Sequence, residues 1–336
     1  MKHRSVLRGI LALGLGLLMS AGAQAQAFRT YLSGSGNDAN PCTLVAPCRL
    51  LPAAIAAVID GGEVWMLDSA NYNSGPVNVN KSVTILAIPG ALGSVVALGG
   101  NAINIATAGV KVALRNLVIV PYVGGGGTYG IIMTAGASLT ADKCLIANLP
   151  EAGIHVSANG ASVLVMDTVI KGNGGSGLYV GNGAHATVTR ATISGNGSTG
   201  VVAQGSGGTT TADITDSTMD ANTQGVVANS TAPAASVKVS VRNSQVVRNS
   251  NFGLLAIANG GGAPTLSASN NIISNNNTGL AAWGTGTKVW ASGNTVSDNV
   301  TGLQNSNSAV FESAGDNAVR NNGTNASGAI SAIPKM

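Results

Sequence analysis

The sequence predicts an all-β protein whose short parallel strands wind into a stacked coil, a parallel β-solenoid. A phrase of an asparagine, a turn and a glycine recurs along the chain, as in ISGNGSTGVV (193–202) and ISNNNTGLA (273–281). Between the turns lie runs of three to five residues rich in β-branched side chains, such as ATVT and KVSV. The repeating glycine recurs every 23 to 28 residues, a period typical of stacked repeats, at Gly130, Gly153, Gly177, Gly200, Gly225, Gly253, Gly279 and Gly302.

The length of the repeat selects a coil over other repeat architectures. No unit contains a helix-length apolar stripe, which excludes helical repeats, and a propeller blade needs about 40–45 residues. Three short strands and three turns fit one unit of about 24 residues, with successive coils stacked at roughly 4.8 Å. From Val83 to Asn322 we expect about ten coils and a rod roughly 50 Å long.

The recurring asparagines are predicted to be structural. Equivalent residues of successive coils lie above one another, so their side-chain amides can bond as a ladder. We expect each of these asparagines also to adopt the left-handed turn conformation, which Asn tolerates better than other non-glycine residues. The predicted ladder consists of Asn173, Asn196, Asn222, Asn249, Asn276 and Asn299, with Asn322 at its end.

The composition supports a folded chain made of small residues. Charged residues are 9% of the 336, against roughly 25% in an average globular protein. Apolar residues are 45% and are regularly spaced, which argues against disorder.

Residues 1–27 are predicted to be a signal peptide. A basic start, MKHRSVLRG, precedes the apolar run ILALGLGLLMSAGA, with cleavage expected after Ala25 or Ala27. The alternative is a membrane anchor, but the run is shorter than the roughly 20 residues that a span needs. We therefore expect an exported protein, periplasmic or extracellular, with no membrane span after cleavage.

Removal of the leader also removes most of the net positive charge. Lys2, Arg4 and Arg8 leave with it, so the formal charge falls from +4 to +1 (4 − 3 = 1). No basic cluster remains that could neutralise several phosphates, so we expect no nucleic-acid partner.

Residues 28–82 are predicted to hold an N-terminal strand, a disulfide loop and a short capping helix, before a β-helix over 83–333. Cys42 and Cys48 lie six residues apart in an exported chain and should form a disulfide, whereas Cys144 should be a buried free thiol. In LLPAAIAAVIDGG, the predicted helix begins near Pro52 and places Leu51, Ile55, Val58 and Ile59 on one face; Gly61 and Gly62 end it.

At both ends, and in its repeats, the sequence resembles the right-handed parallel β-helix proteins of the pectin-lyase-like fold, over about residues 28–333. The opening FRTYLSGSGNDANPCTLVAPCRLLPAAIAAV, the following NYNSGPVNVNKSVTILA and the closing ESAGDNAVRNNGTNASGAI are similar to a group of secreted bacterial members. The resemblance implies a fold that hosts polysaccharide lyases, hydrolases and epimerases, so it does not define one activity.

Motifs that the resemblance would associate with catalysis are missing. The sequence lacks the paired aspartates, Gly-His-Gly and Arg-x-Lys of galacturonan hydrolases, and the Asp-Pro-His-Asp of epimerases. The calcium-binding nonapeptide repeat is also absent.

One column of turn residues is the candidate for chemistry. Six residues before successive ladder asparagines lie Asp167, Arg190 and Asp216, so stacking would place Arg190 between the two acids. The preferred interpretation is that Arg190 relieves their repulsion; the alternative is an arginine base beside acids that bind a sugar acid or calcium. Asp213, Asp216 and Asp220 leave a calcium ion open as an alternative to our expectation of no cofactor or metal.

A second column is the candidate for binding. In GIHV and GLYV, alternation points His155 and Tyr179 outward on neighbouring coils. The same column continues with Val202, Val227, Leu255 and Ala281, which reflects either strand propensity or a contact surface for sugar rings or another protein chain. Trp283 and Trp290 either extend this stripe or pack at the C-terminal end.

Two functions follow from these candidates. The first is an exported, non-catalytic β-helix protein that binds a surface glycan or a protein partner. The alternative is a polysaccharide lyase or related carbohydrate-active enzyme. Three or more ionisable groups clustered on one outer face would favour the enzyme. The oligomeric state stays open.

Overall fold

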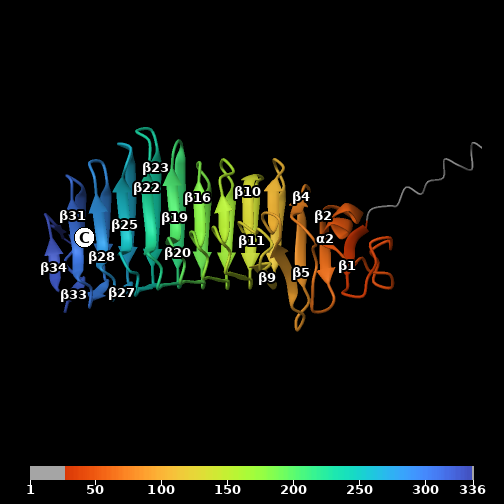
Figure 1. The fold of residues 1–336 in the computed structure, drawn as a ribbon. Coiled ribbons are helices and arrows are strands. Elements are labelled where there is room, and N and C mark those ends of the chain that lie inside the picture. Colours follow the sequence, from red (N-terminus) through yellow and green to blue (C-terminus); the bar gives the residue numbers. More distant parts are fainter. Residues whose placement is uncertain (1–26, 335–336) are drawn as a thin grey trace, which may run out of the picture.

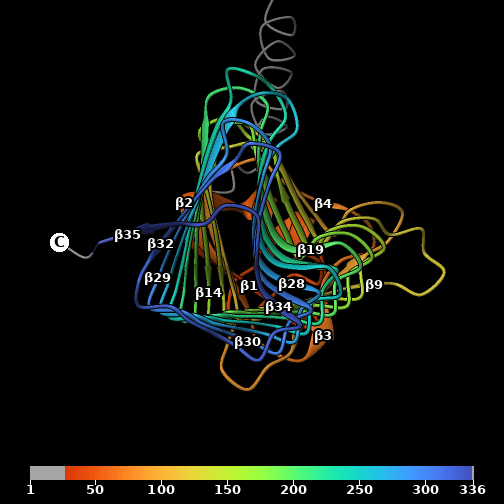
Figure 2. The ribbon, with the colours of Figure 1, turned by 90° about the vertical axis from the view of Figure 1, so that its left-hand side faces the viewer.

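The fold is a rod of about eleven turns, described by a computed structural model over residues 27–334 (Figure 1). The predicted leader lies outside the described residues except for Ala27. Three parallel sheets run along the rod and enclose one interior, as the view along its axis shows (Figure 2). The all-β prediction of three strands and three turns per coil is confirmed.

Sheet A is the longest sheet and has thirteen strands. They are β1 (Ala27–Leu32), β2 (Val58–Met66), β5 (Val83–Ala87), β8 (Lys111–Arg115), β11 (Ser138–Asp142), β14 (Ser162–Met166), β17 (His185–Thr189), β20 (Thr209–Thr215), β23 (Ser236–Arg242), β26 (Ala263–Ser269), β29 (Lys288–Ser292), β32 (Val310–Ala314) and β35 (Ser331–Ile333).

Sheet B has eleven shorter strands. They are β3 (Ala70–Asn71), β6 (Gly93–Ala97), β9 (Leu117–Pro121), β12 (Leu145–Ala147), β15 (Val169–Lys171), β18 (Thr192–Ser194), β21 (Thr218–Asp220), β24 (Gln245–Val247), β27 (Ile272–Ser274), β30 (Thr295–Ser297) and β33 (Ala318–Arg320).

Sheet C also has eleven strands. They are β4 (Val77–Val79), β7 (Ile103–Ala106), β10 (Ile131–Ala135), β13 (Ile154–Val156), β16 (Leu178–Gly181), β19 (Thr199–Gly205), β22 (Gln224–Ser230), β25 (Phe252–Ala258), β28 (Thr278–Trp283), β31 (Thr301–Ser306) and β34 (Thr324–Ser327).

The winding begins before Val83, so the prediction of about ten coils was one short. Strands β1 to β4 lie in the N-terminal segment and already belong to the three sheets, with β1 and β2 pairing in parallel at the start of sheet A. The sequence count missed them because it began at Val83, although an asparagine and a glycine, Asn73 and Gly75, already lie before β4.

The interior is filled by small and medium aliphatic side chains from all three sheets. Ile154, Val156, Leu178 and Val180 have no exposed surface, as their alternation predicts. Strands of successive coils pair in register, so each buried side chain stacks on its equivalents one coil away. Burying every second residue of each strand supplies the main stabilisation of the rod.

The predicted asparagine ladder is confirmed. Each Oδ1 accepts a hydrogen bond from the side-chain amide of the asparagine one coil earlier, at 2.8 Å for Asn173 to Asn196 and for Asn196 to Asn222. The same oxygen also accepts from that residue's backbone N–H, as in Asn196 to Asn222 at 3.0 Å. The chain of bonds continues through the remaining predicted members, Asn249, Asn276, Asn299 and Asn322.

The left-handed conformation lies one residue before each ladder asparagine, so our expectation on this point was wrong. Positive φ occurs at Gly172, Ala221, Arg248 and Asn275, each immediately before a ladder member. The preceding residue turns the chain, which leaves the asparagine free to point its amide into the stack. The turn column that contains Asp167, Arg190 and Asp216 also has positive φ.

A second ladder follows that column and was not predicted. Here the backbone N–H of one coil donates to a side-chain oxygen of the next: Ser217 to Ser244 at 3.2 Å, Ser244 to Asn271 at 3.0 Å, and Asn271 to Asn294 at 3.0 Å. Hydroxyl and amide oxygens both accept such bonds, so the column has no single residue type to detect in the sequence.

The repeated glycine fits the ladder because there is no room for a side chain. A Cβ at Gly200 would lie 2.6 Å from the carbonyl oxygen of Gly225 and 3.1 Å from the amide nitrogen of Asn222. Each ladder asparagine therefore points its amide inward, and the repeating glycine of the preceding coil packs directly against that amide.

The helix α2 (Leu51–Ala57) is shorter than predicted. Leu51, Ala54 and Ile55 are buried, but Val58 and Ile59 already belong to β2, where β-branched side chains are favoured. Gly61 and Gly62 lie within that strand, at a shift in its pairing with β1. That α2 caps the rod stays a prediction.

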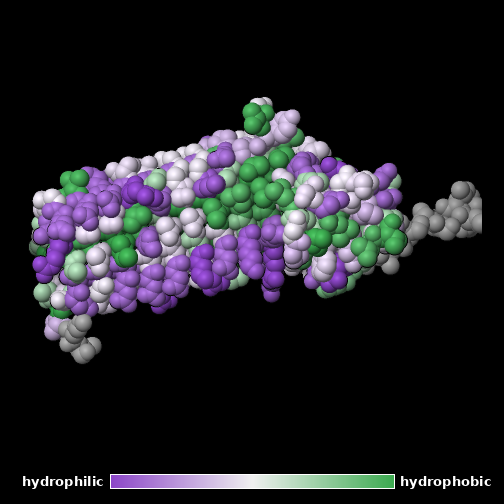
Figure 3. Space-filling view, turned by 90° about the horizontal axis from the view of Figure 1, so that it is seen from below, coloured by the Kyte–Doolittle hydropathy of each residue, from purple (hydrophilic) through white to green (hydrophobic). Residues whose placement is uncertain are grey.

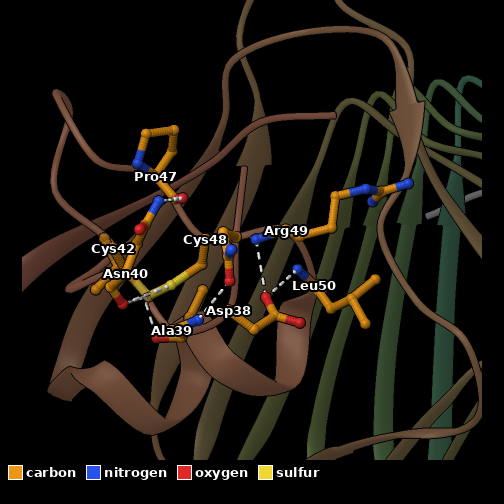
Figure 4. Close-up of a disulfide and its surroundings, with 11 residues drawn as sticks. Asp38, Ala39, Asn40, Cys42, Pro47, Cys48, Arg49 and Leu50 are labelled. Carbon is orange, nitrogen blue, oxygen red and sulfur yellow. Dashed lines mark hydrogen bonds between the residues drawn. A yellow bond between two sulfur atoms is a disulfide. The ribbon is translucent and has the colours of Figure 1, made fainter. Parts of the chain in front are cut away.

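The predicted Cys42–Cys48 disulfide is present and closes a loop against the outer edge of β1 (Figure 4). Tyr31 N–H donates to the carbonyl of Cys42 and Cys48 N–H donates to that of Tyr31, at 2.8 and 3.0 Å. Asp38 accepts from the backbone N–H groups of Arg49 and Leu50, both at 2.8 Å (Figure 4). The loop thus satisfies backbone groups that an open sheet edge would expose.

Candidate functional site

The outer face of sheet C carries a row of aromatic rings. His155 and Tyr179 are paired in register on β13 and β16, and their rings stack with centroids 4.3 Å apart and planes 2° from parallel. Tyr129 extends the row, with its ring 5.2 Å from that of His155. Strand stacking thus turns two outward residues into a continuous ring surface.

The position of the Tyr179 ring depends on a nearby glycine, and burial determines the protonation of both His155 and Tyr179. A Cβ at Gly181 would lie 2.9 Å from the Tyr179 ring and phenol oxygen, so the glycine leaves room for the ring to lie over its own strand. Burial lowers the pKa of His155, which favours the neutral imidazole, and raises the pKa of Tyr179.

The apolar column beyond Tyr179 is buried, which differs from the exposed stripe that we expected. Val202, Val227, Leu255 and Ala281 are at most 9% exposed and pack with Phe252 as a cluster of their own, separate from the interior. Tyr179, Ile257 and Trp283 pack against this cluster and cover it.

The two tryptophans lie on different faces. Trp283, on sheet C, packs against Phe252 with ring centroids 5.6 Å apart and lines a hollow of about 220 Å³ with Ile257 and Asn259. Trp290 lies on β29 of sheet A and is 36% exposed. Only Trp283 therefore extends the candidate binding face.

A chain of side-chain amides runs beside the aromatic residues. Asn259 donates to Asn229 at 3.1 Å, and Asn229 donates to Gln204 at 3.4 Å. At the N-terminal end of the same sheet, Asn104 donates to Asn78 at 2.9 Å. These amides offer hydrogen-bond donors and acceptors without charge.

Asp, Glu, Lys and Arg residues are segregated away from the strands of this sheet. None of the eleven described strands of sheet C contains Asp, Glu, Lys or Arg, and His155 is their one histidine. The charged residues of the described strands lie on sheets A and B, for example Lys111, Asp213 and Asp220. The strands of sheet C therefore supply aromatic, amide and hydroxyl groups but no carboxylate pair.

The Asp167–Arg190 pair lies elsewhere, at the turn between sheets A and B. Arg190 Nε and Nη2 donate to the two carboxylate oxygens of Asp167 at 2.7 and 2.9 Å. This bidentate bond lowers the pKa of Asp167 and raises that of Arg190. In-register pairing of the preceding strands places Arg190 between Asp167 and Asp216, one coil from each, as expected. Its guanidinium is hydrogen-bonded to Asp167, whereas Asp216 acts on it through a weaker charge interaction.

The other acids of that region do not converge. Asp220 pairs with Arg248 at 2.6 Å, and Asp213 lies on sheet A. Within residues 27–334 no group of three or more His, Cys, Asp or Glu side chains could hold a metal ion. Cys144 is buried as predicted, and burial raises the pKa of its thiol to about 11.

Comparison with known proteins identifies the class as a right-handed parallel β-solenoid. A family model described as "Right handed beta helix region" matches residues 129–296, half of the chain. The chain belongs to this right-handed β-helix family. No curated protein sequence matches it.

Several solved structures share the fold at low sequence identity. Pectate lyase Pel9A is 15% identical with a TM-score of 0.56, over 84% of this chain and 76% of that one. The A-module of the Azotobacter vinelandii mannuronan C-5 epimerase AlgE4 is 13% identical with a TM-score of 0.57, over 82% and 91%. These likenesses support the pectin-lyase-like fold.

No helix within residues 27–334 is both long and apolar enough to cross a membrane.

Proposed function

We propose that this protein is exported and binds a neutral glycan along the outer face of sheet C, without catalysis. The predicted leader and the Cys42–Cys48 disulfide support export, because disulfides persist in oxidising compartments.

The composition of sheet C is the observation that carries this proposal. Ligand sites in proteins combine apolar and aromatic surface with a few placed polar groups. Here the rings of Tyr129, His155, Tyr179 and Trp283 offer apolar faces or edges, and nearby amides offer hydrogen bonds to hydroxyl groups. The absence of charged residues from the described strands of this sheet favours an uncharged polymer.

The same composition argues against catalysis on this face. General acid–base chemistry needs a side chain that gains or loses a proton beside the scissile bond. In the described strands of sheet C, His155 and Tyr179 are the two side chains that could exchange a proton. Burial lowers the pKa of His155 and raises that of Tyr179, so both are held in the uncharged form.

A polysaccharide lyase or related enzyme is the second candidate. The fold is shared with a pectate lyase and a mannuronan epimerase, which favours carbohydrate chemistry in general. The acid and base candidates that the sequence offers for such an enzyme are Asp167 and Arg190. They are already bonded to each other at an exposed turn.

A glycan array on the purified chain, with an absorbance assay for unsaturated uronates, tests the proposal. Trp283→Ala should weaken neutral-glycan binding about tenfold or more, because a partly buried aromatic anchor is lost. Trp290→Ala is the matched control, since it removes a tryptophan from sheet A, and it should leave binding unchanged. Turnover of a uronate polymer, or equal effects of the two variants, would contradict the proposal.

A further inference from the structure

A separate hollow of about 600 Å³ lies on the outer face of sheet B, near its N-terminal end. Its floor contains Val118, Leu145 and Val169, which occupy one outward column on β9, β12 and β15. Figure 3 looks onto this side of the rod and shows an apolar area bordered by hydrophilic residues. The volume is within the range of about 300–1,000 Å³ that small-molecule sites occupy.

One wall of the hollow is a loop, residues 88–92, held in place by hydrogen bonds. Leu92 is 52% exposed, and its N–H donates to Ser69 Oγ at 2.9 Å. The Asn116 amide donates to the carbonyls of Ala87 and Ile88 at 3.2 and 3.4 Å. The wall is therefore built into the fold.

The three aliphatic residues form the one unbroken apolar run of this column before it reaches Ile272, further along the rod. The same outward column continues into Thr192 on β18, Thr218 on β21 and Gln245 on β24. The change marks Val118, Leu145 and Val169 as a local apolar surface left partly open to solvent.

Two lysines border this surface and give it a positive charge. Lys143 and Lys171 line the hollow and are exposed, and within residues 27–334 neither ammonium group has a hydrogen bond or ion pair. Asp167 also lines the hollow, but its carboxylate is held by Arg190 in the bidentate pair. Lys143 also interacts with Asp167 through charge, but the three cations Lys143, Lys171 and Arg190 outweigh this one carboxylate, so the hollow has a net positive charge.

We propose that this hollow binds an anionic amphiphile, a ligand with a carboxylate head and an aliphatic body. The head pairs with Lys143 or Lys171, and the aliphatic body covers Val118 and Leu145 against Leu92. The floor lacks the aromatic rings that distinguish sheet C, which favours a flexible hydrocarbon over a sugar ring. The site is independent of the proposed glycan face, because it lies on another sheet.

Calorimetric titration of the purified chain with octanoate and decanoate, below their critical micelle concentrations, tests this. Each added methylene should tighten binding by up to about fourfold, as burial of a CH₂ group predicts. Decyl glucoside, which has a neutral head, should bind at least fivefold more weakly than decanoate. A decanoate isotherm that does not saturate, or an affinity independent of chain length, would overturn the proposal.

Matched variants locate the site. Leu145→Ser and the double change Lys143→Gln with Lys171→Gln should each weaken decanoate binding at least fivefold, with unchanged circular dichroism. Ile272→Ser in the same outward column, and Lys238→Gln with Lys288→Gln on sheet A, are the controls and should have no effect. Equal losses in the controls, or tighter binding of an oligogalacturonate at the same residues, would refute the assignment. Trp283→Ala should leave decanoate binding intact, so failure here is distinguishable from failure of the glycan proposal.

Discussion

Replacing Asn222 by alanine should destabilise the rod more than any change at the end of the ladder. The Asn222 side chain is 2% exposed and makes four hydrogen bonds. Its oxygen accepts from the N–H and the amide of Asn196 at 3.0 and 2.8 Å. Its nitrogen donates to Asn249 at 3.2 Å and to the carbonyl of Ile193 at 3.0 Å.

The magnitude follows from the groups left without partners. Alanine leaves two donors of Asn196 without these acceptors, and a buried unpaired group costs about 1–3 kcal/mol. We therefore expect a loss of about 2–5 kcal/mol in the free energy of unfolding. Asn322 accepts the equivalent two bonds from Asn299, but it is partly exposed, so water can replace it and the loss should be about 1 kcal/mol or less.

Urea unfolding followed by circular dichroism measures both variants. Gln245→Ala is the control, because Gln245 is exposed on sheet B and its loss should cost no more than about 0.5 kcal/mol. Equal shifts for Asn222→Ala and Asn322→Ala, or a shift for Asn222→Ala no larger than that of the control, would refute the ladder as a source of stability.

Three further predictions concern single positions. Gly200→Ala should cost about 1–3 kcal/mol by crowding the next coil, while Gly207→Ala, with no atom within 4 Å of its Cβ, should cost much less in the same urea assay. The Cys144 thiol, whose pKa burial raises to about 11, should stay protonated and resist a thiol reagent at pH 8 until urea unfolds the chain; rapid labelling of the folded protein would contradict this. Arg190→Ala should raise the pKa of Asp167 toward its ordinary value, because the guanidinium now lowers it; carboxyl NMR would show the shift, and an unchanged pKa would mean that the pair does not form in solution.

The ladder and the coil were predictable because stacking imposes the same residue at the same place in each turn. Asn196 and Asn222 repeat as asparagine because the amide oxygen accepts from the coil before while the amide nitrogen donates to the coil after. The second ladder escaped prediction because Ser217, Ser244 and Asn271 share only an acceptor oxygen.

The candidate sites depend on relations that a linear pattern does not contain. The outward direction of His155 and Tyr179 followed from alternation, but the burial of Val202 depends on side chains of other coils that cover it. The hollow on sheet B depends on a loop, residues 88–92, that lies beside strands far along the chain. The neutrality of sheet C becomes visible only when the coils are aligned by their pairing.

Because the coils stack in register, this molecule can become longer or shorter by one whole coil at a time. Asn173 and Asn196 are separated by 23 residues, and both are followed by a short turn and a glycine, Gly177 and Gly200. Excising residues 174–196 would join Asn173 to the turn before Gly200 and place its amide below Asn222. The rod would shorten by roughly 4.8 Å with every sheet intact, since each coil contacts only its neighbours. Gain or loss of a coil is thus a route by which such a chain can change its reach without a new fold.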